Sequence, residues 1–206
     1  MLDLPPPDPA LEIVIASQGM SKGIRQTDGV QLVVRPELAS GPLFVGGLVK
    51  NVSSTSADFE VHALLGLRGE AAGFDLSASA AAKFGVGGRG HADRDSVEFQ
   101  LAASRAFGPL TPRIALTWSP DDLGGVGESL YAELTASLRL GGHASLSAGL
   151  GRRERAGAPD YTAFNAGASW SFSRTIALDL RYYDTAQSGL GAVYEPRLVG
   201  ALRLRF

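Results

Sequence analysis

Apolar and polar residues alternate along most of the chain with a period of two rather than the roughly 3.6 of a helix. Residues 129–140 give the clearest example, because the even positions from Leu130 to Leu140 are all apolar while most odd positions are polar. The same alternation recurs in 174–184 and 196–206. A period of two turns successive side chains to opposite faces of a strand, so the sequence predicts an all-β protein.

Alternating segments continue along the whole chain and predict about twelve strands, an even number that is typical of bacterial outer-membrane barrels. Several run about ten residues, which is long for a globular strand but suits one that crosses a bilayer. The expected strands lie near 11–20, 30–37, 42–51, 57–68, 73–84, 95–107, 109–119, 128–140, 143–152, 161–172, 174–184 and 196–206.

The expected connections alternate between short and long, which matches the periplasmic turns and extracellular loops of such a barrel. We therefore predict a transmembrane antiparallel up-and-down β-barrel of about 12 strands over 11–206, after an N-terminal periplasmic extension at 1–10. Arg105 falls on an otherwise apolar face and Pro112 lies inside a strand. A bulge near either residue would shift the register of the side chains that follow.

Composition narrows the class of protein further. The 206 residues are 45% hydrophobic and 19% charged, yet no apolar run approaches the roughly 18 residues that a membrane-spanning helix needs. The 19 basic and 21 acidic residues leave a net charge of -2, which argues against nucleic-acid binding. The absence of cysteine excludes disulfides and thiolate metal sites. Met1 opens no targeting segment, so we expect an exported form to have had its signal peptide replaced by this Met.

Charged residues of the strands fall mainly on the polar face. An Arg or Lys in the lipid would cost about 2 to 4 kcal/mol at mid-depth, so we expect these residues to point inward. Basic residues outnumber acidic ones on that face, which favours anions, although pairing with the facing carboxylates would account for them equally well. The residues expected to line the pore are Arg35, Lys50, Glu60, Arg68, Asp75, Lys83, Glu98, Arg113, Glu133, Arg139, Asp179, Arg181, Arg197 and Arg203.

Aromatic residues fall near both ends of the apolar faces, as the two interfacial girdles of a membrane barrel require. A soluble β-sandwich with aromatic residues in its core remains the alternative from periodicity alone. The expected interface residues are Phe74, Phe107, Phe172 and Phe206 beside the short turns, and Phe84, Trp118 and Tyr182 beside the long loops.

Three segments resemble the TorF-type putative porin family of proteobacterial outer-membrane β-barrels: 22–28 (KGIRQTD), 118–121 (WSPD) and 182–185 (YYDT). Lys22 and Arg25 stand where that family usually has Arg and Ser. The chain also ends on Phe206, which resembles the terminal signal that the barrel-insertion machinery reads. The resemblance implies a bacterial outer-membrane location, membrane lipid as surroundings, and passive diffusion of small polar solutes.

We therefore expect a porin-like channel for small hydrophilic solutes, without enzymatic activity, cofactor or metal. A barrel plugged by paired charges is one alternative, because both signs line the lumen. An outer-membrane hydrolase is the other, with His91 and Asp93 or Asp95 at the extracellular rim and Ser96 as the nucleophile.

Overall fold

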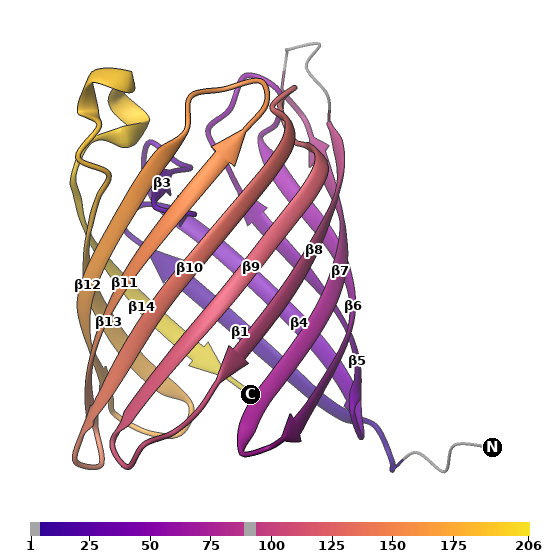
Figure 1. Ribbon diagram of the computed structural model, residues 1–206, viewed down its shortest axis with the longest axis vertical. Coiled ribbons are helices and arrows are strands. Elements are labelled where there is room, and N and C mark those ends of the chain that lie inside the picture. Colours follow the sequence, from indigo (N-terminus) through magenta and orange to yellow (C-terminus); the bar gives the residue numbers. More distant parts are fainter. Residues whose placement is uncertain (1–4, 89–93) are drawn as a thin grey trace.

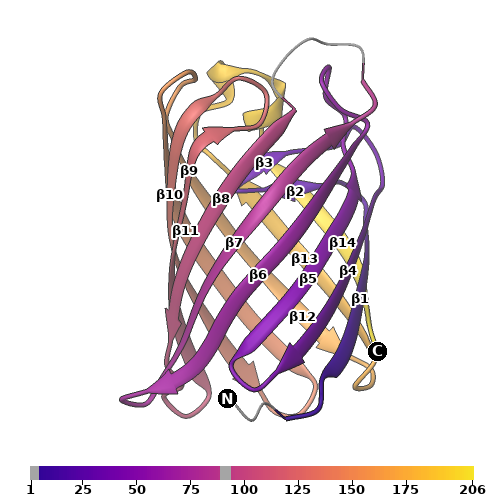
Figure 2. The same cartoon turned by 90° about the vertical axis from the view of Figure 1, so that its right-hand side faces the viewer.

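A computed structural model describes residues 5–88 and 94–206, and twelve of its strands close into one antiparallel barrel (Figures 1 and 2). The all-β class and the expected twelve strands are thereby confirmed. The barrel strands are β1 (Asp8–Ala16), β4 (Gln31–Ser40), β5 (Leu43–Asn51), β6 (Phe59–Ala71), β7 (Phe74–Val86), β8 (Asp95–Ser104), β9 (Leu110–Asp122), β10 (Gly127–Leu140), β11 (Ala144–Arg155), β12 (Tyr161–Ser171), β13 (Ile176–Asp184) and β14 (Arg197–Arg205).

Each barrel strand pairs with its neighbours along the chain, and β1 closes the ring by pairing with β4 on one side and β14 on the other. The backbones of Leu11 and Phe206 complete this seam with two hydrogen bonds, of 3.0 and 2.9 Å. Strand β1 begins at Asp8, so residues 8–10 of the expected extension lie in the first strand.

The register runs without a bulge past Arg105 and Pro112, the two positions where the sequence allowed one. Strands β8 and β9 keep one register from Phe99↔Trp118 to Ser104↔Arg113. The Arg105 N–H then donates to the Pro112 carbonyl at 3.3 Å. Pro112 has no N–H to return, and β8 ends one residue before Arg105. A register shift does occur in the pairing of β10 with β9, between Gly127 and Ser129.

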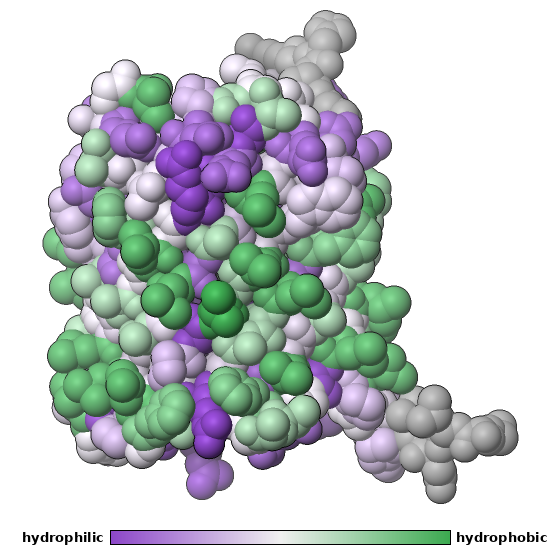
Figure 3. Space-filling view, in the orientation of Figure 1, coloured by the Kyte–Doolittle hydropathy of each residue, from purple (hydrophilic) through white to green (hydrophobic). Residues whose placement is uncertain are grey.

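The two faces of the barrel wall differ as the alternation predicts. Large apolar side chains are exposed on the outside, among them Leu65, Leu101, Ile114, Leu134 and Leu180. Figure 3 shows apolar residues around the middle and the turn end of the barrel, with hydrophilic residues concentrated at the loop end. Among the described residues no helix is long and apolar enough to cross a membrane.

The connection from β1 to β4 folds inward instead of standing above the barrel. It contains a small hairpin of β2 (Met20–Ser21) and β3 (Ile24–Arg25), whose turn is Lys22 and Gly23. Both residues have positive φ, 49° and 84°, as a tight two-residue hairpin turn requires. Figures 1 and 2 place this hairpin within the barrel outline near the loop end. We call it the lumen hairpin.

Candidate functional site

The lumen hairpin lies against the inner side of β12 and against the 3-10 helix η2 (Ala192–Tyr194). Ile24 packs in a buried cluster with Tyr161, Ala163 and Tyr194. The Tyr161 side chain is fully buried, and its hydroxyl donates to the Lys22 carbonyl at 2.8 Å. Gly23 is required at the turn, because a Cβ there would overlap the Cβ of Ala163. The hairpin therefore follows the contour of this wall closely.

A second set of contacts fixes the root of the hairpin. The Gly19 N–H donates to the Thr27 hydroxyl at 2.7 Å, and the Gln26 N–H donates to the Gly19 carbonyl at the same distance. The Gln26 carbonyl accepts from the Ser53 N–H at 2.7 Å, which ties the hairpin to the next loop. Thr27 is only 2% exposed. These bonds satisfy backbone groups of an element too short to be stable alone.

The Lys22 side chain extends from the hairpin turn to strands β8 and β9, where it pairs with two carboxylates. Its Nζ lies 2.5 Å from Glu98 Oε2 on β8 and 3.7 Å from Asp122 Oδ2 at the end of β9. Burial lowers the pKa of the Lys22 ammonium below its ordinary value, while the charges of the two carboxylates oppose that change.

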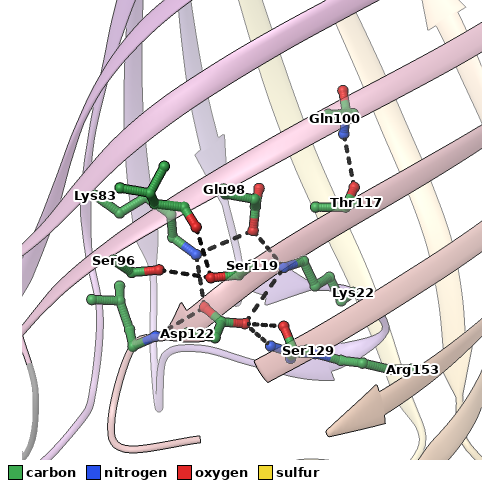
Figure 4. Close-up of polar contacts among 12 residues, drawn as sticks. Lys22, Lys83, Ser96, Glu98, Gln100, Thr117, Ser119, Asp122, Ser129 and Arg153 are labelled. Carbon is green, nitrogen blue, oxygen red and sulfur yellow. Dashed lines mark hydrogen bonds and ion pairs between the residues drawn. The ribbon is translucent and has the colours of Figure 1, made fainter. Parts of the chain in front are cut away.

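Two further cations complete the cluster shown in Figure 4. Lys83 Nζ lies 3.0 Å from Asp122 Oδ1 and 3.2 Å from Glu98 Oε2, and Arg153 Nη2 pairs with Asp122 Oδ2. We call Lys22, Lys83, Glu98, Asp122 and Arg153 the Lys22 network. It joins the hairpin to β7, β8, β9 and β11, and it contains three cations against two carboxylates. Charges this close are stable when buried only because each has a partner.

Cavities lie on both sides of the hairpin and the Lys22 network. The one toward the loops has a volume of about 260 Å³, and the network itself forms part of its wall together with the loop residues Ser54, Ser56 and Val126. Nearer the turn end, a cavity of about 290 Å³ is lined mainly by Ser, Thr and Ala, with Arg113 and Arg181 as its cations. We call the cavity toward the loops the vestibule. The hairpin and the network therefore narrow the lumen between the charged vestibule and the turn-end cavity, which is lined by small residues.

All fourteen residues expected to line the pore lie on the inner face, each beside an apolar residue of the outer face. Only Lys83 and Glu98 of that set belong to the Lys22 network. Near it, Lys50 Nζ pairs with Glu60 Oε2 at 2.9 Å, and His62 Nε2 lies 3.2 Å from the same carboxylate. That the fourteen residues line an open pore stays a prediction.

The other members of the set form separate groups. Arg35 pairs with Glu12 at 2.7 Å, and Arg203 lies 3.8 Å from the same carboxylate. Arg68 pairs with Glu37 at 2.8 Å. Several of the charges that we expect to line the pore are therefore neutralised by carboxylates of the barrel wall. This is the alternative in which the arginines pair with the carboxylates that face them. Two more of these residues form ion pairs, Arg181 with Asp179 and Arg197 with Glu195. Glu133 accepts a hydrogen bond from the Tyr131 hydroxyl, and Arg113 lines the turn-end cavity. Asp75 and Arg139 are exposed near the turn end.

The seven aromatic residues expected at the membrane interface all have exposed side chains. Those expected beside the short turns and those expected beside the long loops lie at opposite ends of the barrel strands. Their contact with lipid headgroups stays a prediction. They are Phe74, Phe107, Phe172 and Phe206 at the turn end, and Phe84, Trp118 and Tyr182 toward the loop end.

Sequence reasoning missed three of the five residues in the Lys22 network. Asp122 and Arg153 were expected in loops, but β9 continues to Asp122 and β11 to Arg155. The sequence pointed to Lys22 only as part of the segment 22–28 that resembles the TorF-type family, although its side chain contacts a strand more than seventy residues away. The local signal that could have found Asp122 is its place directly after a segment of clear alternation.

The hydrolase alternative gains no support from the described residues. His91 and Asp93 lie outside them. Ser96 is buried on the inner face, where its hydroxyl lies 3.1 Å from the Ser119 hydroxyl (Figure 4). Across residues 5–88 and 94–206, no cluster of three or more His, Asp or Glu side chains is arranged to hold a metal ion.

No family model matches the chain, and no curated protein matches it. Solved structures do. The KdgM porin in complex with disordered oligogalacturonate is similar at TM-score 0.68 and 8% identity, over 96% of this chain and 99% of that one. The NanC porin has a TM-score of 0.60 and 9% identity, and the match covers 95% of this chain and 97% of that one. An outer membrane channel from Pseudomonas putida F1 has a TM-score of 0.55 and 16% identity, and the match covers 97% of this chain and 94% of that one. The chain has the closed twelve-strand barrel fold of these outer-membrane channels.

Proposed function

We propose that this chain is a bacterial outer-membrane channel for passive diffusion of small hydrophilic solutes, with a mild preference for anions. The lumen hairpin held by the Lys22 network is the observation that carries this proposal. Barrels of about eight strands are filled by side chains and those of about sixteen leave a wide channel, so twelve strands leave room for a constricted path. The hairpin supplies the constriction.

The charge around the vestibule supports the preference for anions. Its wall contains the cations Lys22, Lys50, Lys83, Arg94, Arg153 and Arg155 but only the carboxylates Glu60, Glu98 and Asp122. An excess of Lys and Arg in a confined space attracts anions, and the low-dielectric wall strengthens that field. Solute selection in this proposal depends on size and charge and needs no covalent step.

The proposal also includes the surroundings of the barrel. The exposed apolar belt and its aromatic residues suit outer-membrane lipid. Phe206 directly follows the closing strand β14, where the barrel-insertion machinery would read it, and the residues before the barrel would extend into the periplasm. Membership of the TorF-type family, which the resemblance implies, belongs to the same proposal.

The buried ion pairs favour a second candidate, a structural barrel that is closed at rest. Reconstitution into a planar bilayer separates the two. A channel gives discrete ion conductance, and under a KCl gradient its reversal potential shifts toward that of chloride. A folded barrel without conductance contradicts the channel and favours the closed barrel.

A substitution in the vestibule tests the preference for anions. Replacing Lys50 with Gln leaves the Glu60 carboxylate without its 2.9 Å partner, so we expect the reversal potential to move toward that of potassium. Arg139→Gln is the matched control, because Arg139 lies exposed on the inner face near the turn end. Equal shifts in the two variants would contradict a role for the vestibule in selection.

A further inference from the structure

An apolar groove of about 700 Å³ runs along the outer face of the barrel near its turn end. Small side chains on neighbouring strands, Ala78 on β7 and Ala103 on β8, form its floor. Larger outward residues rise around them, among them Leu67, Leu101 and Ile114. A depression with this lining accepts a hydrocarbon chain, because most of the surface that it offers is apolar.

A cation lies at the turn end of the groove. Arg105 follows Ala103 on the outward face, two residues nearer the turn end, and its side chain is exposed. Its guanidinium carbon lies 5.2 Å from the centre of the Phe74 ring and 5.3 Å from that of the Phe107 ring. The two aromatic rings hold the guanidinium at the turn end of β7 and β8, just beyond the residues that line the groove. In the part of the chain that the structure describes, Arg105 forms no ion pair with a carboxylate.

We infer that the groove and Arg105 together bind one phospholipid, with an acyl chain in the groove and the headgroup phosphate on the guanidinium. This inference rests on the proposed membrane location of the barrel. A guanidinium presents a planar fork of N–H donors that matches two phosphate oxygens. The Phe74 and Phe107 rings belong to the predicted aromatic girdle at the turn end, and such a girdle meets the headgroups at the depth of the lipid phosphate.

A second copy of this chain fits the groove less well. Two copies side by side in one membrane are related by an axis along the bilayer normal, so the same face of each would meet at the same depth. Two hollow faces would leave the groove unfilled, and two Arg105 side chains would approach each other. A phospholipid supplies both the apolar volume and the opposite charge.

Native mass spectrometry of the folded barrel in mild detergent tests the inference. After incubation with phosphatidylglycerol, we expect the wild-type chain to retain one lipid. Arg105→Gln should weaken that retention about tenfold, the scale of one charge-assisted hydrogen bond. Ala78→Leu fills the groove from the lipid-facing side and should weaken it comparably. Arg174→Gln, at an exposed arginine in the turn between β12 and β13, is the matched control and should retain the lipid.

Two probes identify the source of the binding. Diacylglycerol with the same chains should be retained weakly, and inorganic phosphate in excess should not displace the phospholipid. Equal retention by wild type, Arg105→Gln and Ala78→Leu overturns the inference, as does a dimer that only Ala78→Leu disrupts. Conductance is measured separately. A conducting barrel that retains no lipid contradicts the lipid site alone, whereas a barrel that retains lipid without conducting contradicts the channel alone.

Discussion

At the scale of single residues, Asp122 joins more elements than any other member of the Lys22 network. It is the last residue of β9 and only 3% exposed. Its carboxylate receives Lys22, Lys83 and Arg153, and it also accepts from the Ser129 hydroxyl and the Leu123 N–H, each at 2.9 Å. One carboxylate thereby connects the hairpin, three strands and the start of a loop.

Replacing Asp122 with Asn removes that charge with little change of shape. Lys22 and Lys83 then keep only Glu98 as a carboxylate partner, and Arg153 loses the carboxylate with which it pairs. Loss of one buried partner of such a pair costs about 3 kcal/mol. We expect the free energy of unfolding to fall by about that amount in urea titrations of the barrel folded in detergent.

Asp75→Asn is the matched control, because Asp75 is an exposed carboxylate of the inner face. A surface change of this kind should cost no more than about 0.5 kcal/mol. Equal losses in the two variants would mean that the Lys22 network does not stabilise the barrel.

At the scale of elements, the lumen hairpin depends on the wall that it contacts. Its two strands have two residues each, far fewer than an independent hairpin needs. Tyr161 and Tyr194 form the surface that the hairpin contacts, with ring centres 5.4 Å apart in an edge-to-face arrangement and Arg155 over both rings. The constriction is therefore as rigid as the Tyr161 contact and the Lys22 network make it.

Gly23→Ala tests whether the hairpin narrows the pore. The added Cβ would overlap that of Ala163, and a φ of 84° strains any residue with a side chain. We expect the hairpin to move off β12 and the single-channel conductance in planar bilayers to rise. Gly29→Ala, in the same connection, is the control, since nothing lies within 4 Å of a Cβ there. Conductance that changes equally in both variants would contradict a hairpin constriction.

The strands of this fold follow from the sequence far better than its constriction does. Alternation such as that of 129–140 places a strand and its outward face without knowledge of its partners, because the period belongs to the backbone itself. The lumen hairpin has no such pattern, since a two-residue strand is too short to show a period. Its position depends on contacts of Lys22 and Gly23 with residues far along the chain, which one-dimensional patterns do not record.

At the scale of the whole molecule, closure depends on the seam between β1 and β14. Their pairing extends from Glu12↔Arg205 to Ala16↔Ala201, and the two hydrogen bonds between Leu11 and Phe206 continue it. The Phe206 ring is 67% exposed on the outside. The backbone of Phe206 therefore helps to close the barrel, whereas its ring is exposed on the outer surface.

Two variants separate these contributions. Phe206→Ala keeps the backbone bonds, so we expect unchanged refolding in detergent but less folded barrel in cell outer membranes. Deletion of Phe206 removes the bonds as well and should lower both. Heat-modifiable migration on gels measures the folded fraction in each case. A normal cellular yield of Phe206→Ala would show that the insertion machinery does not need the ring.

The contact between the lumen hairpin and Tyr161 also bears on the order in which parts of the barrel fold. The hairpin follows β1, the first strand, whereas the Tyr161 hydroxyl that binds the Lys22 carbonyl lies 139 residues later. Contacts between parts so distant along the chain form late, after the intervening strands have found their neighbours. We therefore expect the hairpin to reach its final position only after the strands between β4 and β12 have paired. The constriction would then be among the last features that a newly made molecule acquires.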